Sequence, residues 1–367
     1  MAIWHCSFHK CAEKTPTNLD NLHPSAFIRG PSFFDSVAPM SLKSQLLEWM
    51  SGGQGDFAEL SLKVFRHQFA ENKAYRRYCE ALGKTPENIT SWHAIPAVPT
   101  DVFKLPGQAL RCFPESEVTG HFLTTGTTSE VRGRNEFRDL WLYEASVHGT
   151  WQLLDLPEIR RPWFFSQRPE ANPNSSLVRM FGFLDEGGTW LIDADGRMNT
   201  GKFRPVQPAA VFGTSISLLK ACDKIPPLTL PQGSWILETG GSKGLRESFS
   251  PAEVRTRLSA HFGVPETRIL NEYGMTEMFS QFYKWGHQET HSGPPWTGIR
   301  VIDVHSGEPA APGGIGYLEI IDLANLDTVS TIRTQDLAIA VGEREFILIG
   351  RDSAAVARGC SRGVQDF

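Results

Sequence analysis

Apolar residues recur at helical spacing in the first third of the chain. The run from Met40 to Met50 and residues 56–82 place apolar side chains three or four positions apart. This spacing predicts amphipathic helices that cover one face of a core. Residues 136–155 show the same spacing and predict another helix. Residues 95–104 lie between these segments, and their prolines predict an irregular connection.

Shorter apolar runs alternate with helical patterns in the middle of the chain. Buried strands are predicted for three of these runs, at 163–166, 209–215 and 235–241. The second run leads into a helical pattern, and Ser250 with Pro251 predicts the N-cap and first turn of a helix over 251–262. Strands that alternate with helices predict an α/β fold with a mostly parallel sheet.

The pattern changes after about residue 297 to short strands separated by turns, which predicts a small β-rich subdomain. Residues 1–39 are rich in Pro, Asn and Ser and are expected to be a disordered extension. Met40 is therefore a candidate start of the ordered protein and of translation. The expected organisation is an extension at 1–39, an α/β core at 40–297, the β-rich subdomain at 298–350 and a C-terminal tail at 351–367.

The composition favours a water-soluble enzyme-sized protein. The chain has 367 residues, of which 40% are hydrophobic, so it can bury a sizeable core. Its net charge of −5 does not favour a nucleic-acid partner, and no apolar run approaches the roughly 18 residues that span a bilayer. Six scattered cysteines and the lack of an apolar signal segment predict a reduced, cytoplasmic protein.

A hydroxyl-rich run at Thr124-Thr125-Gly126-Thr127-Thr128-Ser129 is the first candidate for chemistry. Glycine lets a backbone approach a phosphate chain closely, and each Thr or Ser adds a rotatable donor. The Gly-Lys-Ser/Thr ending of a Walker P-loop is missing. Taken alone, the run is equally typical of a turn between a strand and a helix.

Later segments add an aromatic ring and carboxylates. Tyr273 and Glu277, after a short predicted strand at 268–270, could stack on a nucleobase and ligate Mg²⁺. Asp336 could accept hydrogen bonds from ribose hydroxyls or be an ordinary hairpin aspartate. The Gly350-Arg351-Asp352 segment follows a predicted strand at 346–349.

The order of these motifs resembles the adenylate-forming enzymes, which include acyl-CoA synthetases, firefly-type luciferases and peptide-synthetase adenylation domains. The resemblance covers about residues 92–363 and rests on four motifs in the family order: the threonine run, Tyr273 to Glu277, Arg333 to Asp336, and Gly350 to Asp352. The chain stops sixteen residues after Arg351, so the mobile C-terminal domain of that superfamily is expected to be absent. The short ending resembles the acyl-protein synthetase branch, the fatty acid–protein ligases of bacterial bioluminescence.

The resemblance implies a two-step reaction that uses ATP and Mg²⁺. A long-chain fatty acid becomes acyl-AMP with release of pyrophosphate, and a protein thiol then takes the acyl group as a thioester for a partner such as an acyl reductase. The resemblance implies that the phosphates are bound by Thr124, Thr125, Gly126, Thr127 and Thr128, with Thr276 at the α-phosphate and Glu277 on Mg²⁺. It implies that Tyr273 and Gly274 lie against adenine and that Asp336 and Arg351 hold the ribose. Gly240 and Gly241 would lie beside the nucleotide and the acyl group.

Cys360 is the candidate acyl acceptor. Arg358 and Arg362 flank it, and nearby positive charge raises the thiolate fraction of a cysteine. Without the family resemblance, a free surface cysteine would be the simpler interpretation. A small acyl-CoA or aryl-CoA ligase that uses CoA as acceptor is an alternative, and so is a non-catalytic regulator that binds nucleotide or fatty acid.

Three residues depart from the superfamily pattern. Ser129 replaces a usual glycine, Arg132 stands near a usual lysine, and Gln335 replaces the glycine common before the ribose-binding aspartate. The superfamily's catalytic lysine lies in the C-terminal domain that is expected to be absent. Efficient adenylation is therefore expected to depend on compensation from a partner or from the tail.

Overall fold

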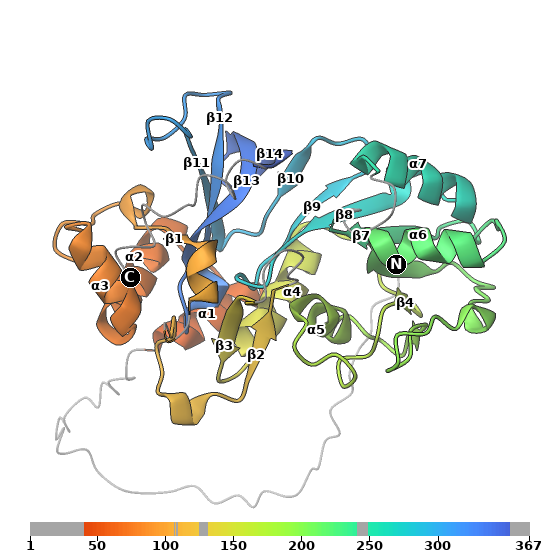
Figure 1. The fold of residues 1–367 in the computed structure, drawn as a ribbon, viewed down its shortest axis with the longest axis horizontal. Coiled ribbons are helices and arrows are strands. Elements are labelled where there is room, and N and C mark those ends of the chain that lie inside the picture. The colour runs from red at the N-terminus through yellow and green to blue at the C-terminus, as the bar shows by residue number, and fades with distance from the viewer. Residues whose placement is uncertain (1–39, 106, 108, 125–130, 241–248, 353–367) are drawn as a thin grey trace, which may run out of the picture. The chain divides into compact units, whose positions relative to one another are not determined.

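The computed structural model describes residues 40–352, apart from residues 106, 108, 125–130 and 241–248 (Figure 1). The helices expected between residues 40 and 82 are confirmed as α1 (Leu42–Met50), α2 (Phe57–Glu71) and α3 (Lys73–Ala81). A hairpin of β2 (Gly120–Leu123) and β3 (Arg134–Phe137) follows. The next helix, α4 (Trp141–Leu153), begins later than expected because residues 134–137 pair with β2.

Strands and helices alternate in the middle of the chain, as predicted. The elements are β4 (Trp163–Phe165), α5 (Ser176–Phe183), β5 (Thr189–Trp190), β6 (Ala210–Thr214), α6 (Ser215–Lys224), β7 (Trp235–Thr239), α7 (Pro251–Phe262) and β8 (Ile269–Tyr273). Helix α7 has the expected bounds. The Ser250 hydroxyl accepts from the backbone N–H of Glu253, and the Glu253 side chain accepts in return from that of Ser250.

The last part of the described chain is formed by strands. They are β9 (Phe282–Trp285), β10 (Thr290–Ser292), β11 (Thr297–Ile302), β12 (Ile315–Asp322), β13 (Thr331–Gly342) and β14 (Glu345–Arg351). Together with β1 (Val98–Pro99), which pairs with β13, they extend one sheet in the order β11-β12-β13-β14-β10-β9-β8-β7-β6-β4-β5.

The sheet is mixed: it is parallel among the strands that alternate with helices in the α/β core, as predicted, and antiparallel from β8 through the β-rich part. Strands β5, β4, β6, β7 and β8 are parallel, whereas neighbouring strands from β8 through to β11 are antiparallel. Helical crossovers return the chain to the same edge and give parallel pairs, while short turns give antiparallel ones. The predicted parallel arrangement therefore holds only where helices intervene.

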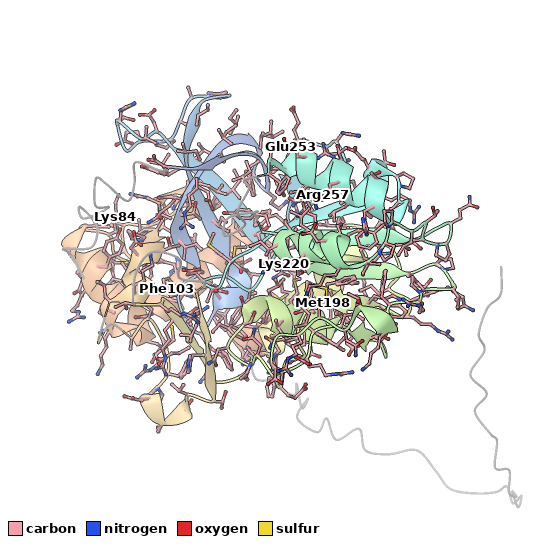
Figure 2. All side chains as sticks on the ribbon, turned by 45° about the vertical axis from the view of Figure 1, so that its right-hand side comes forward. Lys84, Phe103, Met198, Lys220, Glu253 and Arg257 are labelled. Carbon is pink, nitrogen blue, oxygen red and sulfur yellow. The ribbon has the colours of Figure 1, made fainter. Side chains whose placement is uncertain are left out.

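Two apolar layers cover the parallel strands. On one face, α6 and α7 pack on residues such as Val211, Ile236 and Ile269. On the other face, α4 and α5 pack on Phe212, Leu237 and Leu270. Figure 2 shows the side chains of Lys220 on α6 and Arg257 on α7, the two neighbouring helices. None of the helices in the described part of the chain is long and apolar enough to cross a membrane.

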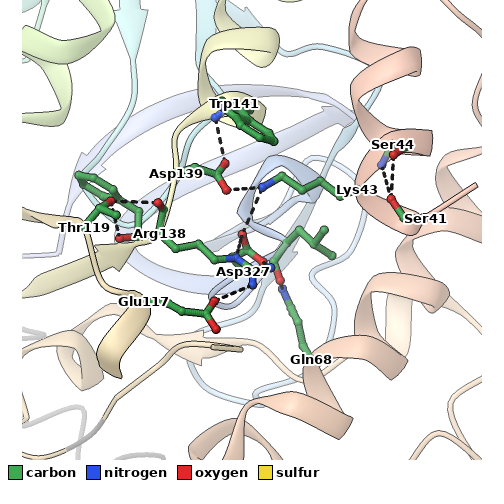
Figure 3. Close-up of polar contacts among 12 residues, drawn as sticks. Ser41, Lys43, Ser44, Gln68, Glu117, Thr119, Arg138, Asp139, Trp141 and Asp327 are labelled. Carbon is green, nitrogen blue, oxygen red and sulfur yellow. Dashed lines mark hydrogen bonds and ion pairs between the residues drawn. The ribbon is translucent and has the colours of Figure 1, made fainter. Parts of the chain in front are cut away.

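A cluster of ion pairs joins α1 to the start of α4 and to the turn before β13 (Figure 3). Asp327 accepts hydrogen bonds from Arg138 Nε at 3.1 Å and Nη2 at 2.7 Å. Lys43 lies 2.5 Å from Asp139 and 3.7 Å from Asp327, and Glu117 lies 3.2 Å from Arg138. The Asp327 side chain is 14% exposed, so its two-point contact with arginine is sheltered from water.

Replacing Asp327 with Ala is expected to lower the free energy of unfolding by about 1–3 kcal/mol. The change removes a bidentate partner of Arg138 and leaves part of that guanidinium without an acceptor. Glu117→Ala is the matched control, because Glu117 is half-exposed and should contribute under about 1 kcal/mol. Thermal and urea unfolding of both variants would measure the difference, and equal losses would contradict the assigned role of Asp327.

Candidate functional site

The candidate site lies where β7 and β8 end. The two strands are parallel neighbours, and Thr239 pairs with Glu272 in register. Gly240 therefore follows one strand, and Gly274 follows the other, at the same edge of the sheet. Gly240 has φ of +77° with open space where a Cβ would lie, so a non-glycine residue there would be strained. In open α/β sheets this edge, at the carboxyl ends of the strands, is where ligands bind.

Polar side chains from other elements fix the loop that follows β8. Asn135 of β3 donates to the Thr276 carbonyl at 2.9 Å, and Asn325 donates to the Glu277 carbonyl at 2.6 Å. The buried carboxylate of Asp322 accepts from two consecutive backbone N–H groups further along the loop, both at 2.8 Å. Thr276 and Glu277 are thus held by backbone contacts from separate parts of the sequence.

Thr124 lies at the base of the β2–β3 connection. It exchanges two hydrogen bonds with Gly133, one from its backbone N–H at 2.9 Å and one to its hydroxyl at 2.8 Å. The Thr276 hydroxyl lies 3.5 Å from the Leu123 carbonyl, so the connection starts beside the β8 loop. The connection joins two antiparallel strands, which corrects the alternative of a turn between a strand and a helix.

Three residues expected at the nucleotide lie together. The Tyr273 hydroxyl donates to Asp336 at 2.9 Å, and Asp336 pairs across β13 and β14 with Arg351. Tyr273 is buried at the end of β8, rather than after it, and packs edge-on against Phe346. Burial and the nearby Asp336 carboxylate raise the pKa of Tyr273 well above its usual value. Its phenol therefore stays protonated and acts as a donor.

Glu277 is a buried carboxyl in the same region. Burial raises its pKa to about 7, against the effects of its own backbone N–H and of the Lys104 and Arg351 charges. Such a group is costly to ionise unless a cation is close. No group of three or more potential metal-ligating side chains occurs in the described residues.

A segment from the N-terminal half of the chain also contacts the candidate site, and the sequence did not predict this contact. Within the connection expected to be irregular at 95–104, residues 98–104 form β1 and the short 3₁₀-helix η2 (Thr100–Lys104), which corrects that part of the expectation. Gln335 donates to Asp101 at 2.6 Å and accepts from Arg351 at 3.0 Å. Lys104 lies 2.7 Å from the other oxygen of Asp101. Only the departure of Gln335 from the family glycine signalled this arrangement in the sequence.

Two further buried carboxyls, Glu238 and Glu272, were also missed. Ser215 and Asn271 each donate to Glu238 at 2.5 Å, and Thr239 donates to Glu272. A Cβ on Gly274 would lie 2.3 Å from the Glu272 carboxyl, so this close approach requires glycine. The available signal was a charged residue within each otherwise apolar strand. Burial raises the pKa of Glu238, and it raises that of Glu272 to about 7.

Replacing Glu272 with Gln is expected to remove a pH-dependent loss of stability. Below about pH 4.5 the Glu272 carboxyl is protonated in both the folded and the unfolded protein. Between about pH 4.5 and pH 7 it loses its proton in the unfolded chain but keeps it in the folded protein. Stability therefore falls as pH rises through this window, by on the order of 3 kcal/mol in full. The variant should gain stability relative to the native protein between pH 5 and pH 8 in urea unfolding.

A matched control for that measurement is Glu253→Gln. Hydrogen bonds from Ser250 lower the pKa of Glu253, so its titration lies below about pH 4.5. This variant should show no relative change between pH 5 and pH 8. The same stability difference at both pH values for Glu272→Gln would show that Glu272 does not titrate in the expected window.

Several predicted site residues lie outside the described residues. They are Thr125, Gly126, Thr127, Thr128, Gly241 and Cys360. The described site residues are Thr124, Gly240, Tyr273, Gly274, Thr276, Glu277, Asp336 and Arg351. All of them lie at strand ends or on the loops just described, except Asp336, which lies in the middle of β13. The structure thus brings the described members of four separate motifs to one region.

Comparison with known proteins supports the family resemblance. The family model "Acyl-protein synthetase, LuxE" matches residues 35–136. A "Long-chain-fatty-acid--luciferin-component ligase" of Photorhabdus luminescens is 39% identical over 69 residues, which are 19% of this chain. The match spans 57% of the length of that relative.

Solved structures of adenylate-forming ligases share the fold. A 2-hydroxyisobutyryl-CoA ligase in a postadenylation state with 2-HIB-AMP matches with a TM-score of 0.58 and 14% identity, covering 80% of this chain and 67% of that one. An open conformation of such a ligase, in complex with 2-HIB-AMP and CoA, matches with a TM-score of 0.56 and 14% identity, covering 79% and 73%. The chain therefore resembles acyl-protein synthetases over residues 35–136, and it shares its fold with adenylate-forming ligases.

Proposed function

Because the chain resembles acyl-protein synthetases in sequence and adenylate-forming ligases in fold, we propose that it activates a long-chain fatty acid with ATP and transfers the acyl group to a protein thiol. The carboxylate attacks the α-phosphorus of ATP, the bond to the β-phosphate breaks, and pyrophosphate leaves. A thiolate then attacks the acyl carbonyl, the bond from carbon to the AMP oxygen breaks, and AMP leaves. A protein that reduces or accepts acyl groups is the proposed partner.

The observation that carries this proposal is the meeting of Thr124, Thr276, Glu277, Asp336 and Arg351 around the ends of β8 and β14 and the middle of β13. Adenylation gathers negative charge on phosphate oxygens, so it requires fixed donors and cations more than a strong base. The first two residues offer hydroxyl groups, and Arg351 offers a guanidinium.

The nucleoside end of ATP would lie against Asp336 and Tyr273. Asp336 already accepts from the Tyr273 hydroxyl and retains further lone pairs for ribose hydroxyls. Tyr273 and Gly274 at the end of β8 would border the adenine, and Gly240 with Gly241 would border the nucleotide and the acyl group. The Arg351 side chain, held by Gln335, would approach the ribose from β14.

Mg²⁺ fits this site through Glu277. The buried carboxyl of Glu277 would become fully ionised beside a divalent cation, which reverses the effect of burial on its pKa. When bound, Mg²⁺ would neutralise charge on the phosphate oxygens. Asn325, through the Glu277 carbonyl, keeps this residue in place.

Cys360 is the proposed acyl acceptor, and the described cysteines support that choice. Burial raises the pKa of Cys79 and of Cys222 to about 12, and raises that of Cys112 even more. At neutral pH a thiol of pKa about 12 is ionised in only about one molecule in 10⁵, so none of the three suits nucleophilic attack. Cys360, between two arginines in sequence, lies outside the described residues.

The test is incubation of the purified protein with a radiolabelled long-chain fatty acid, with and without ATP and Mg²⁺. We expect pyrophosphate release and a protein-bound label that hydroxylamine removes. Pyrophosphate release that requires added CoA and leaves no label would assign the chain to the acyl-CoA ligases instead. Absence of both signals across fatty acids of different length would overturn the enzymatic proposal and favour a binding protein.

A further inference from the structure

The 3₁₀-helix η2 lies between two parts of the candidate site. Strand β1 pairs in parallel with β13, with Val98 opposite Ile332 and Pro99 opposite Arg333. Helix η2 follows β1 directly and therefore runs beside the next residues of β13. On its other side it contacts β3: Phe103, labelled in Figure 2, has its Cβ 3.5 Å from where a Cβ on Gly133 would lie. Helix η2 thus reaches both the Thr124 connection and the Asp336 region.

One amide couples η2 to the end of β14. The Gln335 side chain donates its N–H to Asp101 at 2.6 Å and accepts from Arg351 at 3.0 Å. Asp101 uses its second oxygen for Lys104, at 2.7 Å. A glycine at position 335 could make neither contact. The Asp101 carboxylate, which orients Lys104, is therefore held by Gln335, the residue before the proposed ribose-binding Asp336.

The Lys104 ammonium is accessible and belongs to the last residue of η2. The preceding residue, Phe103, approaches Gly133, whose backbone N–H donates to the Thr124 hydroxyl, so Lys104 lies at the end of η2 that meets the Thr124 connection. The Lys104 side chain is 37% exposed and its partner Asp101 29% exposed, so the ammonium can exchange a carboxylate oxygen for a phosphate oxygen. The four-carbon stem of lysine gives the needed reach.

Building on the proposed function, we propose that Lys104 is a catalytic residue that binds the phosphate chain of ATP, and that Asp101 and Gln335 are its positioning residues. The transferred and leaving phosphates carry growing negative charge, which a lysine beside them stabilises. No proton or covalent transfer is assigned to Lys104.

The test compares Lys104→Met, Lys104→Arg and the matched control Lys63→Met. Lys63 forms a similar local pair on α2, with Glu59 at 2.6 Å, and is 39% exposed. We expect Lys104→Met to lower kcat for acid-dependent pyrophosphate release at least tenfold and to weaken ATP binding, with adenosine binding unchanged. Lys104→Arg should recover part of kcat, and Lys63→Met should match the native protein. All four proteins should unfold at similar temperatures, because the altered pairs are exposed.

Equal kinetics in native protein and Lys104→Met, or equal weakening of ATP and adenosine binding, would overturn the assignment. If the native protein releases no pyrophosphate, the proposed function fails. The role of Lys104 is then decided by whether Lys104→Met weakens the binding of ATP more than the binding of adenosine. If the native protein does not bind ATP, the proposed function and the role of Lys104 fail together.

The positioning role has a separate readout. Gln335→Ala should lower kcat less than Lys104→Met, and adding it to Lys104→Met should have little further effect, because both act through one group. If the loss of kcat in the double variant equals the product of the two single losses, Gln335 does not act through Lys104.

Discussion

Replacing Glu277 with Gln is expected to reduce acid-dependent pyrophosphate release at least about 100-fold. Gln has the same shape but carries no charge, so it binds Mg²⁺ poorly and leaves the phosphate charge less neutralised. Losses of about this size follow removal of one preorganised electrostatic group from an active site. The measurement is pyrophosphate release at saturating ATP and fatty acid, over a range of Mg²⁺ concentrations.

The same substitution should leave the fold intact. The Glu277 carboxyl is buried and its pKa is about 7, so the folded protein gains little from its charge when no cation is bound. Gln should therefore preserve or raise the unfolding temperature without Mg²⁺. Glu277→Asp retains the charge on a shorter stem and should retain more activity than Glu277→Gln. Undiminished turnover by the Gln variant would remove Glu277 from the proposed magnesium site.

Local signals in the sequence were sufficient for several elements. Helix α7 was predicted with its bounds, because Ser250 and Pro251 mark the start of a helix through backbone hydrogen bonding and a preset φ angle. Helices α2 and α3 followed from apolar spacing, although the residue that separates them, Asn72, was not singled out. Its side chain caps α3 by accepting from the Tyr75 backbone N–H. Such signals act within a few residues and can be read from the chain alone.

The secondary structure predicted from the sequence was wrong where segments far apart in the chain pair with each other. Residues 136 and 137 were included in the helix expected over 136–155, but residues 134–137 pair with β2, which satisfies their backbone groups as a strand. Residues 98–99 are too short and too rich in proline to predict a strand, and only β13 supplies their partner. Both segments contribute to the candidate site, so the site was predicted less completely than the fold.

The residues of the candidate site were predicted from sequence motifs, but the contacts that hold those residues in place were not predicted. Tyr273, Glu277 and Asp336 could be named from the sequence because their chemistry matches the family motifs. The interactions of Asp322 and Asn325 with the β8 loop join residues more than 40 positions apart. No periodicity or composition reports such a contact. Whether the named residues act as proposed is decided by the variants above.

Replacing Cys360 with Ala is expected to abolish acyl labelling while pyrophosphate release in the first turnover remains. A thioester needs a thiolate, and the alanine variant still contains every residue proposed for adenylation. The measurement pairs gel-based detection of labelled fatty acid on the protein with single-turnover pyrophosphate release. A label that persists on the variant would contradict Cys360 as the acceptor.

The other cysteines provide the controls that make this result specific. Cys222 is the least buried of the described cysteines, yet burial still raises its pKa to about 12, so Cys222→Ala should label normally. Cys6 and Cys11 lie outside the described residues, and their joint replacement tests the two thiols of that segment. Loss of label in the Cys6 and Cys11 variant alone would move the acceptor to the N-terminal extension. Normal labelling by every variant would leave Cys79, Cys112 or a non-thiol group as the acceptor, and resistance of the label to hydroxylamine at neutral pH would then indicate the non-thiol group.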